Sequence, residues 1–215
     1  MQRIRISFSR GEKVKYISHL DLMRLWERAL RRAGIPIAYS QGFSPHPKIS
    51  IAAPLPIGVT SDGELMDISL RMRVSPYHFT KVVGEQLPIG ISLLRAEQVE
   101  LRLPSLQSQV RQAEYQVELE TDKGIGEVED ELHSFLAKEH IPWQHQRDTE
   151  MRYYDLRPLV YRLWVVGWQE SVCTLGMRLR ADSTATGRPE QVTAALGFAN
   201  RPRSVHRTRL ILAGS

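Results

Sequence analysis

One histidine of the sequence is fixed between two prolines, His46 within residues 42–50 (GFSPHPKIS). Two missing amide donors exclude a central strand, and each proline pushes the residue before it toward extended backbone. A loop that is stiff before binding loses less entropy when it meets a partner. We therefore expect it to present His46, with Lys48 for a phosphate and Tyr39 or Phe43 for stacking on a base. A rigid turn whose histidine bonds a neighbouring backbone group is the open alternative.

Arginines recur at four-residue spacing upstream of this loop, at Arg24, Arg28 and Arg32, with Arg31 beside them. Like charges at this spacing slightly destabilise an isolated helix, so a stripe of them suits a phosphate backbone. A solvated helix face relieved by neighbouring carboxylates would give the same pattern.

The positive charge belongs to the first half of the chain. The net charge is +5 and the sequence pI is about 9.5. Residues 1–112 hold 16 Lys/Arg against 9 Asp/Glu, whereas residues 113–215 hold 13 against 15. This balance indicates an anionic partner for the first half, and RNA is the partner we expect.

Two histidines are weak catalytic candidates, His19 and His46. Either could serve as the general base of a metal-independent endoribonuclease, with Lys48 stabilising the charge on the phosphorane. His19 follows Ser18 at a predicted helix start, where it needs no function. A module that only binds another protein is the third class of function left open.

A second cluster lies at Tyr153, Tyr154, Asp155 and Arg157. Asp155 could form a turn and pair with Arg157, but both are kept as secondary site candidates for RNA or partner binding.

A last basic group includes Arg203 and Arg207. Strand alternation would place Arg203, Val205, Arg207 and Arg209 on one face, which could extend a nucleic-acid groove. A solvated edge strand protected by charge is the alternative.

Several classes of protein are excluded or disfavoured by composition. There is no apolar run of about 18 residues, so no membrane span is expected, and the strand-like N-terminus favours a cytoplasmic protein. The single cysteine, Cys173, cannot form an internal disulfide or hold zinc or an iron–sulfur cluster by itself. We expect it to be a buried strand thiol, and we expect neither a metal nor a cofactor.

The elements that must position these residues follow from periodicity. In the first half, residues 3–8, 35–40, 64–70 and 90–101 predict strands. A helix capped by Ser18, with Asp21 completing a capping box, runs to about residue 33, and a second helix follows Ser75 and Pro76. This order is the ferredoxin-like βαββαβ arrangement.

The second half repeats the order approximately, with one strand too many. Residues 113–120, 141–146, 159–170, 171–181 and 203–212 predict strands, and residues 126–140 and 186–197 predict helices. We therefore expect an α+β protein of two tandem ferredoxin-like units with antiparallel sheets. The units are a basic half at 1–103 and a second half at 113–215, joined by a polar linker at 104–112.

Four segments together resemble a known family: residues 16–58 (YISHLDLMRLWERALRRAGIPIAYSQGFSPHPKISIAAPLPIG), YYDLRPLV, GRPEQV and RSVHRT. They are similar to the bacterial radical-SAM-associated (radical SAM-linked) proteins, a domain of uncharacterised function. The resemblance implies a radical SAM enzyme as partner. Because this chain lacks a three-cysteine cluster motif, it would be an accessory protein that binds RNA or presents a substrate to that enzyme.

Overall fold

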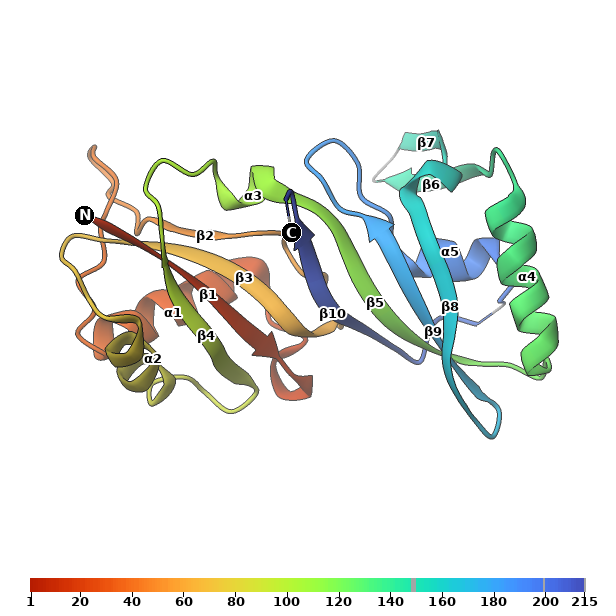
Figure 1. The fold of residues 1–215 in the computed structure, drawn as a ribbon, viewed down its shortest axis with the longest axis horizontal. Helices are drawn as coiled ribbons and strands as arrows, with labels where there is room; N and C mark the ends of the chain where they lie inside the picture. Colours follow the sequence, from red (N-terminus) through yellow and green to blue (C-terminus); the bar gives the residue numbers. More distant parts are fainter. Residues whose placement is uncertain (148–149, 199, 215) are drawn as a thin grey trace. The chain divides into compact units, whose positions relative to one another are not determined.

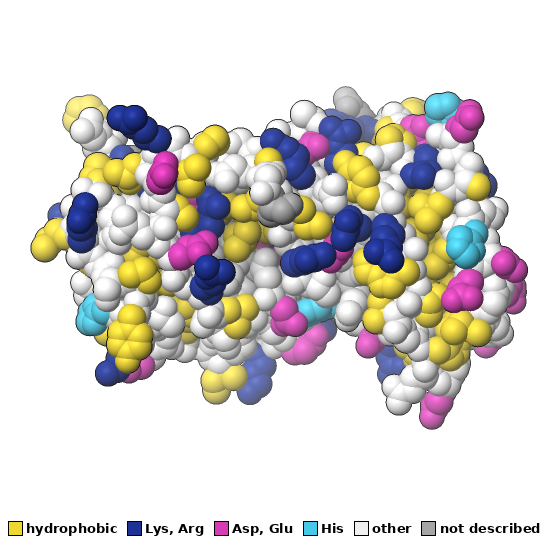
Figure 2. Space-filling view, in the orientation of Figure 1, with side chains coloured by type: hydrophobic (Ala, Val, Ile, Leu, Met, Phe, Trp, Pro, Cys, Tyr) yellow, Lys and Arg dark blue, Asp and Glu magenta, His cyan; other side chains and the backbone are white. Residues whose placement is uncertain are grey.

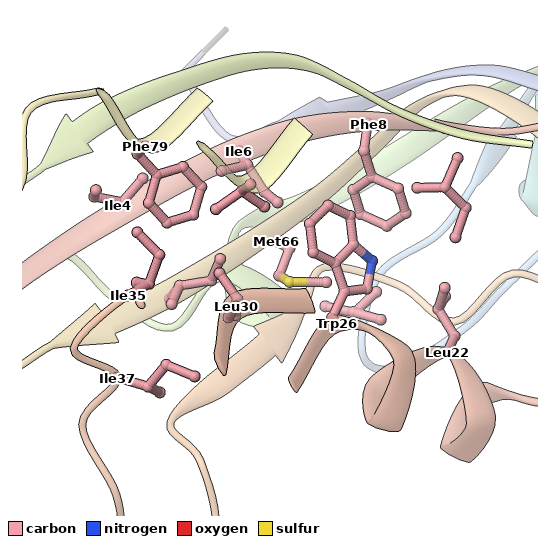
Figure 3. Close-up of a cluster of buried hydrophobic side chains, with 14 of the residues drawn as sticks. Ile4, Ile6, Phe8, Leu22, Trp26, Leu30, Ile35, Ile37, Met66 and Phe79 are labelled. Carbon is pink, nitrogen blue, oxygen red and sulfur yellow. The ribbon is translucent and has the colours of Figure 1, made fainter. Parts of the chain in front are cut away.

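Alternating apolar residues form the first strand, β1 (Gln2–Arg10), which is buried at every second position. Ile4, Ile6 and Phe8 are fully buried, which confirms the strand predicted at residues 3–8. They pack against α1 (His19–Arg32), whose Trp26 meets the Phe8 ring edge to face with the ring centroids 5.0 Å apart (Figure 3).

The start of α1 is fixed by Ser18. Its hydroxyl oxygen accepts the Asp21 backbone N–H at 3.1 Å, so the predicted N-cap is confirmed. The Ser18 hydroxyl in turn donates to the Asp21 carboxylate at 2.7 Å, so this carboxylate bonds the capping side chain. Gly34, at φ +68°, follows the helix in the left-handed conformation that glycine adopts without strain.

The computed structural model describes residues 1–147, 150–198 and 200–214, of which 145–147 and 150 are described by their backbone alone. The chain divides into two compact units, Met1–Val110 and Arg111–Ser215 (Figure 1).

The N-terminal unit is an α+β unit with an antiparallel sheet. Its strands pair in the order β4-β1-β3-β2, and alternate residues of β1 and β3 face the helices. Its elements after α1 are β2 (Ile49–Ile51), β3 (Thr60–Leu70), α2 (Pro76–Gly84), β4 (Ile91–Val99) and the short α3 (Leu106–Gln109); a 3-10 turn, η1 (Glu12–Val14), follows β1.

The second strand of this unit lies elsewhere than predicted. Residues 35–40 form no continuous strand and contribute isolated bridges, Ile37 with Leu70 and Tyr39 with Pro47. Pro36 lacks an amide donor, which limits pairing at this point. The paired strand is β2, directly after the proline loop.

The C-terminal unit has the strand order β10-β5-β9-β8 in its main sheet. The strand predicted at residues 141–146 corresponds to β6, which pairs with β7 in a separate two-stranded sheet and lies outside the main sheet. Sequence patterns did not indicate β7. The elements are β5 (Val110–Glu120), α4 (Ile125–Ala137), β6 (Pro142–Arg147), β7 (Glu150–Asp155), η2 (Arg157–Leu159), β8 (Val160–Gln169), β9 (Val172–Arg180), α5 (Pro189–Ala195) and β10 (Ser204–Leu212).

The single cysteine is buried, as expected. Cys173 lies on β9 with 0% exposure, as expected for a core thiol, and burial raises its pKa to about 11. Among the described residues, no helix is both long and apolar enough to span a bilayer.

Candidate nucleic-acid interface

The proline loop is an excursion from the edge of β3. Ala38, just before the loop, donates its N–H to Ser69 O at 2.8 Å, and Ser69 donates to Lys48 O, just after the loop, at 2.9 Å. The two sides of the neck are joined by Lys48 N–H bonding Ala38 O at 2.8 Å. The chain therefore leaves and rejoins the same strand edge, and the loop is anchored on the sheet.

Within the loop, two hydrogen bonds between Ser40 and His46 bring the two sides of the loop together. Ser40 N–H donates to His46 O at 2.8 Å, and His46 N–H donates to the Ser40 hydroxyl oxygen at 2.9 Å. Residues 41–46 are exposed, and Phe43 is 110% exposed by comparison with an extended chain. An aromatic ring held in water at the tip of a closed loop is a costly arrangement for stability and suits a binding role.

The four arginines of α1 are exposed but have different partners. Arg24 lies 3.5 Å from Asp21, with both side chains largely in solvent, so the pair contributes little. Arg32 is anchored, since Nη2 donates to Gln86 O at 2.7 Å and Nε to Gln86 Oε1 at 3.2 Å. Arg28 and Arg31 form no ion pair with the described residues. Arg24, Arg28 and Arg31 are thus the arginines available to an anion.

The neck of the loop contacts the flank of α1. Tyr39 Oη lies 3.5 Å from Glu27 Oε1, at the long limit of a hydrogen bond. On the helix, Glu27 is one residue before Arg28 and four before Arg31. The base of the loop and this flank of the arginine stripe are therefore neighbours, which sequence spacing could not establish.

The two candidate catalytic histidines lack an orienting acid. His19 and His46 are exposed, and neither imidazole has a hydrogen-bond or ion-pair partner among the described residues. A histidine general base is ordinarily held in one tautomer by a second group. The backbone of His46 is fixed, but nothing described around its ring prepares it for proton transfer.

Asp155 and Arg157 do not pair through their side chains. Asp155 Oδ1 accepts the backbone N–H groups of Ile141 and Arg157 at 2.8 and 3.0 Å. The Arg157 guanidinium donates to Leu136 O, at the end of α4, and to Val160 O. Its contacts are those of a structural clamp between α4 and β8.

Asp155 also contacts a histidine that the sequence did not single out. Its Oδ2 lies 2.7 Å from His140 Nδ1. The pKa of Asp155 is held below its usual range, first by the hydrogen bond from the Ile141 N–H and second by the hydrogen bond with His140. The pair borders a groove of about 990 Å³ whose aromatic lining includes Trp143, Tyr153 and Tyr154. No local signal indicated this pair, because the two residues are 15 positions apart.

The predicted basic face of the last strand is not formed. Val205 and Arg207 lie on the buried face of β10, and Arg207 is 2% exposed. Ser204 lies on the opposite face, where its hydroxyl donates to the Glu118 carboxylate. Arg209 instead bonds Glu114, which lies on the same face of β5 as Glu118. Arg207 and Arg209 therefore point to opposite faces of β10, because the alternation is interrupted between them. Arg203 is exposed and lies 3.9 Å from Glu120.

Fold and surface together define a two-unit α+β protein with mostly antiparallel sheets and an exposed cationic helix beside an aromatic-tipped loop. The chain belongs to the DUF2344 family, described as an uncharacterized protein conserved in bacteria, whose family model matches residues 3–189. None of the curated proteins searched matches the chain.

Solved structures resemble the fold at low sequence identity. A chain of a Cbf5–Nop10–Gar1 complex aligns with a TM-score of 0.52 and 12% identity over 97% of this chain and 48% of that one. A chain of an H/ACA RNP bound to a substrate RNA containing 2'-deoxyuridine gives 0.49 and 12% over 97% and 47%. A RAMP protein binding different RNA substrates gives 0.27 and 11% over 98% and 100%. This chain spans about half the length of the first two, and the likeness to the first is one of fold alone.

Proposed function

We propose that this protein binds RNA through its N-terminal unit and does not itself react with it. The observation that carries the proposal is the closed proline loop, which holds a fully exposed Phe43 and whose neck contacts α1 beside the arginine stripe. An aromatic ring and unpaired guanidinium groups on adjoining elements offer stacking and phosphate contacts to the same strand.

The division of labour follows from the contacts. Arg28 and Arg31 have no competing carboxylate in ion-pair distance among the described residues, and Arg24 has a weak exposed one, so these three hold phosphates. Arg32 keeps its side chain on Gln86 and contributes mainly charge. Phe43 stacks on a base, while the exposed His46 and Lys48 bind at the side of the loop.

We also propose a fold for each unit and a partner enzyme for the protein. Each unit is proposed to be a ferredoxin-like module, supported by the strand orders β4-β1-β3-β2 and β10-β5-β9-β8, with the β6–β7 sheet as an insertion in the second. A radical SAM enzyme as the partner to which RNA is presented is supported by the resemblance of the sequence segments alone.

The endoribonuclease alternative needs an oriented base at His46 or His19, and no described residue offers either ring an orienting acid. The protein-interaction alternative would leave Phe43 and the arginines on a surface for another protein. Both alternatives are outcomes of the experiment that tests RNA binding.

The experiment measures binding of the full chain to a labelled single-stranded RNA at several salt concentrations. Each phosphate contact contributes about 0.7 to the slope of log affinity against log salt for single strands, so Arg24→Gln/Arg28→Gln/Arg31→Gln should shallow the slope by about 2. Arg32→Gln is the matched control. It should change the slope by less than a phosphate-contacting arginine does, because in the native protein the Arg32 guanidinium is bonded to Gln86.

Phe43→Ala tests the loop separately. Base–aromatic stacking gives about 1–3 kcal/mol, so affinity should fall about 5- to 150-fold with the salt slope unchanged. RNA binding with a wild-type slope in the triple variant would refute the helix as the contact. Cleavage of the RNA in EDTA that His46→Ala abolishes would favour the nuclease, and binding of a protein but no RNA would favour the interaction module.

A further inference from the structure

The main sheet of the C-terminal unit has one face that its helices leave open. Along β5 and β9, one set of alternate residues is buried in the core, including Val117 and Leu175. The other set points away from the core and contains Glu114, Gly176 and Arg178. This second set, with its neighbours on β8 and β10, is called the open face of the C-terminal unit.

A row of charged side chains crosses the open face from strand to strand. Arg162 on β8 is the cross-strand neighbour of Arg178 on β9, and Arg178 is the neighbour of Glu114 on β5. Glu114 accepts Arg178 Nε on one oxygen at 2.7 Å and Arg209 Nε from β10 on the other at 2.6 Å. With strands about 4.8 Å apart, the row spans about 14 Å.

The charge of this row is positive. The arginines hold the pKa of Glu114 below its usual range, with Arg209 as the first cause, so this carboxylate is ionised and satisfied at neutral pH. Three arginines then face one carboxylate, and Arg209 remains 58% exposed. Figure 2 shows dark-blue side chains gathered over β5, β9 and β10 of this unit, with a magenta side chain among them.

Next to the row lies a tryptophan that is flat against the sheet. Trp164 on β8 is the cross-strand neighbour of Gly176, and a Cβ added at Gly176 would lie 2.0 Å from Trp164 Cε2. Any other residue at this position would push the indole away, so the glycine creates the seat for the ring. The Arg162 guanidinium carbon lies 5.1 Å from the centroid of the indole.

We infer that the open face of the C-terminal unit binds a single-stranded segment of RNA, with a base stacked on Trp164 and Arg162 and the adjacent phosphates on the arginine row. The sheet covers one side of the indole and the Arg162 guanidinium lies over the ring, so a base reaches the outer side of the indole as Arg162 moves beside it, where the guanidinium plane extends the stack. Duplex RNA hides its base faces, so the site takes unpaired nucleotides. A purely acidic peptide would match the arginines but would leave the ring without a partner.

This site is distinct from the N-terminal surface, because none of its residues lies on α1 or the proline loop. It was also not indicated by the charge balance, since residues 113–215 hold more Asp/Glu than Lys/Arg. The two surfaces can therefore fail independently, and the experiment is designed to separate them.

The test titrates the full chain with a short unlabelled oligouridylate and follows tryptophan fluorescence. Stacking on Trp164 should quench part of the emission, and Trp164→Leu should abolish that quenching and weaken binding about 5- to 150-fold. Trp168→Leu is the matched control, since this tryptophan is also on β8 but pairs opposite the buried Cys173 and bonds Glu170 O. It should keep the site's quenching and affinity.

Two further variants keep the test independent of the tryptophan itself. Gly176→Ala changes no side chain that binds the ligand, but its added methyl group displaces the Trp164 indole from the sheet. This variant should lose the quenching as Trp164→Leu does. Arg162→Gln should shallow the salt slope by about 0.7, whereas Arg188→Gln, at the start of α5, should not.

The outcomes separate the two surfaces. The α1 triple variant should retain the Trp164 quenching, and Trp164→Leu should retain the α1 contribution to the salt slope. Wild-type binding and quenching in Trp164→Leu would overturn the inference whatever the N-terminal surface does. Binding of polyglutamate with no binding of oligouridylate would overturn it in favour of a protein-binding face.

Discussion

The sharpest stability prediction concerns Asp67, a buried carboxylate on β3 that serves two arginines. Arg3 and Arg5 on β1 both donate to it, with Arg3 Nε at 2.7 Å and Arg5 Nε at 2.8 Å. The exposed fractions of the three side chains are 5% for Asp67, 12% for Arg3 and 11% for Arg5. Replacing Asp67 by Asn keeps the shape but leaves two guanidinium groups largely shielded from water without a counter-charge.

The expected magnitude follows from that geometry. Removing one partner of a buried ion pair costs about 3–5 kcal/mol, because the remaining charge is left uncompensated. Arg3 retains hydrogen bonds to Leu103 O and Pro104 O, and both arginines keep some contact with water. The Asp67→Asn variant should therefore be destabilised by about 3 kcal/mol, at the lower end of that range.

Urea unfolding of the full chain, combined with hydrogen exchange of peptides from β1 and β3, measures the loss and locates it in the N-terminal unit. The control is Glu97→Gln on β4, which removes a carboxylate 2.7 Å from Arg95 where the two side chains are 42% and 74% exposed. That exposed pair should contribute about 0–1 kcal/mol. Equal, small losses in the two variants would refute the claim that burial makes the Asp67 cluster strong.

Two further predictions concern titratable groups of the C-terminal unit. Burial raises the Cys173 pKa to about 11 and leaves the thiol 0% exposed, so a thiol reagent should label the native protein only as fast as β9 opens, which labelling at increasing urea concentrations would check. The Glu114 pKa is lowered in the folded state, so its stabilisation is complete above the unfolded value of about 4.3 and is lost as pH falls through the folded value. Thermal denaturation across acidic pH should therefore show a smaller pH-dependent loss in Glu114→Gln, and an unchanged pH profile would contradict the assigned role of Arg209 and Arg178.

Much of the secondary structure could be predicted from periodicity and capping. The alternation along β1 and the Ser18 cap of α1 depend on residues within one or two turns of each other, which is what sequence patterns record. The strand predicted at residues 35–40 was wrong. This segment forms only isolated bridges, one of them from Ile37 to Leu70 of β3, and contacts with a strand distant in sequence are not recorded in a local pattern. Sequence patterns also missed β7, whose only strand partner is β6 in the described chain.

The role of the candidate residues in binding stays a prediction, and the structure adds their surroundings. Phe43 and the α1 arginines are exposed, and only the structure shows that Arg32 is held by Gln86 from another element. The seat of Trp164 on Gly176 depends on the register of β8 against β9. A bulge or a one-residue shift changes which side chains share a face, so this site could not be read from either strand alone.

Charge counted along the chain is a poor guide to where an anion binds, and the C-terminal unit shows why. Much of its acidic charge lies on α4, where Glu127, Glu129 and Asp130 are exposed. On the open face, the row of Arg162, Arg178 and Arg209 around Glu114 is positive although the unit as a whole is not. In the N-terminal unit, Arg3 and Arg5 of β1 share Asp67 and are largely shielded from water, whereas the arginines of α1 are exposed. In the C-terminal unit, Arg178 and Arg209 share Glu114 in the same way, but Arg209 stays 58% exposed and Arg162 adds a third positive charge to the row. Binding sites for a polyanion are therefore set by which arginines stay exposed and outnumber the carboxylates beside them, and the two units place those arginines on different kinds of element.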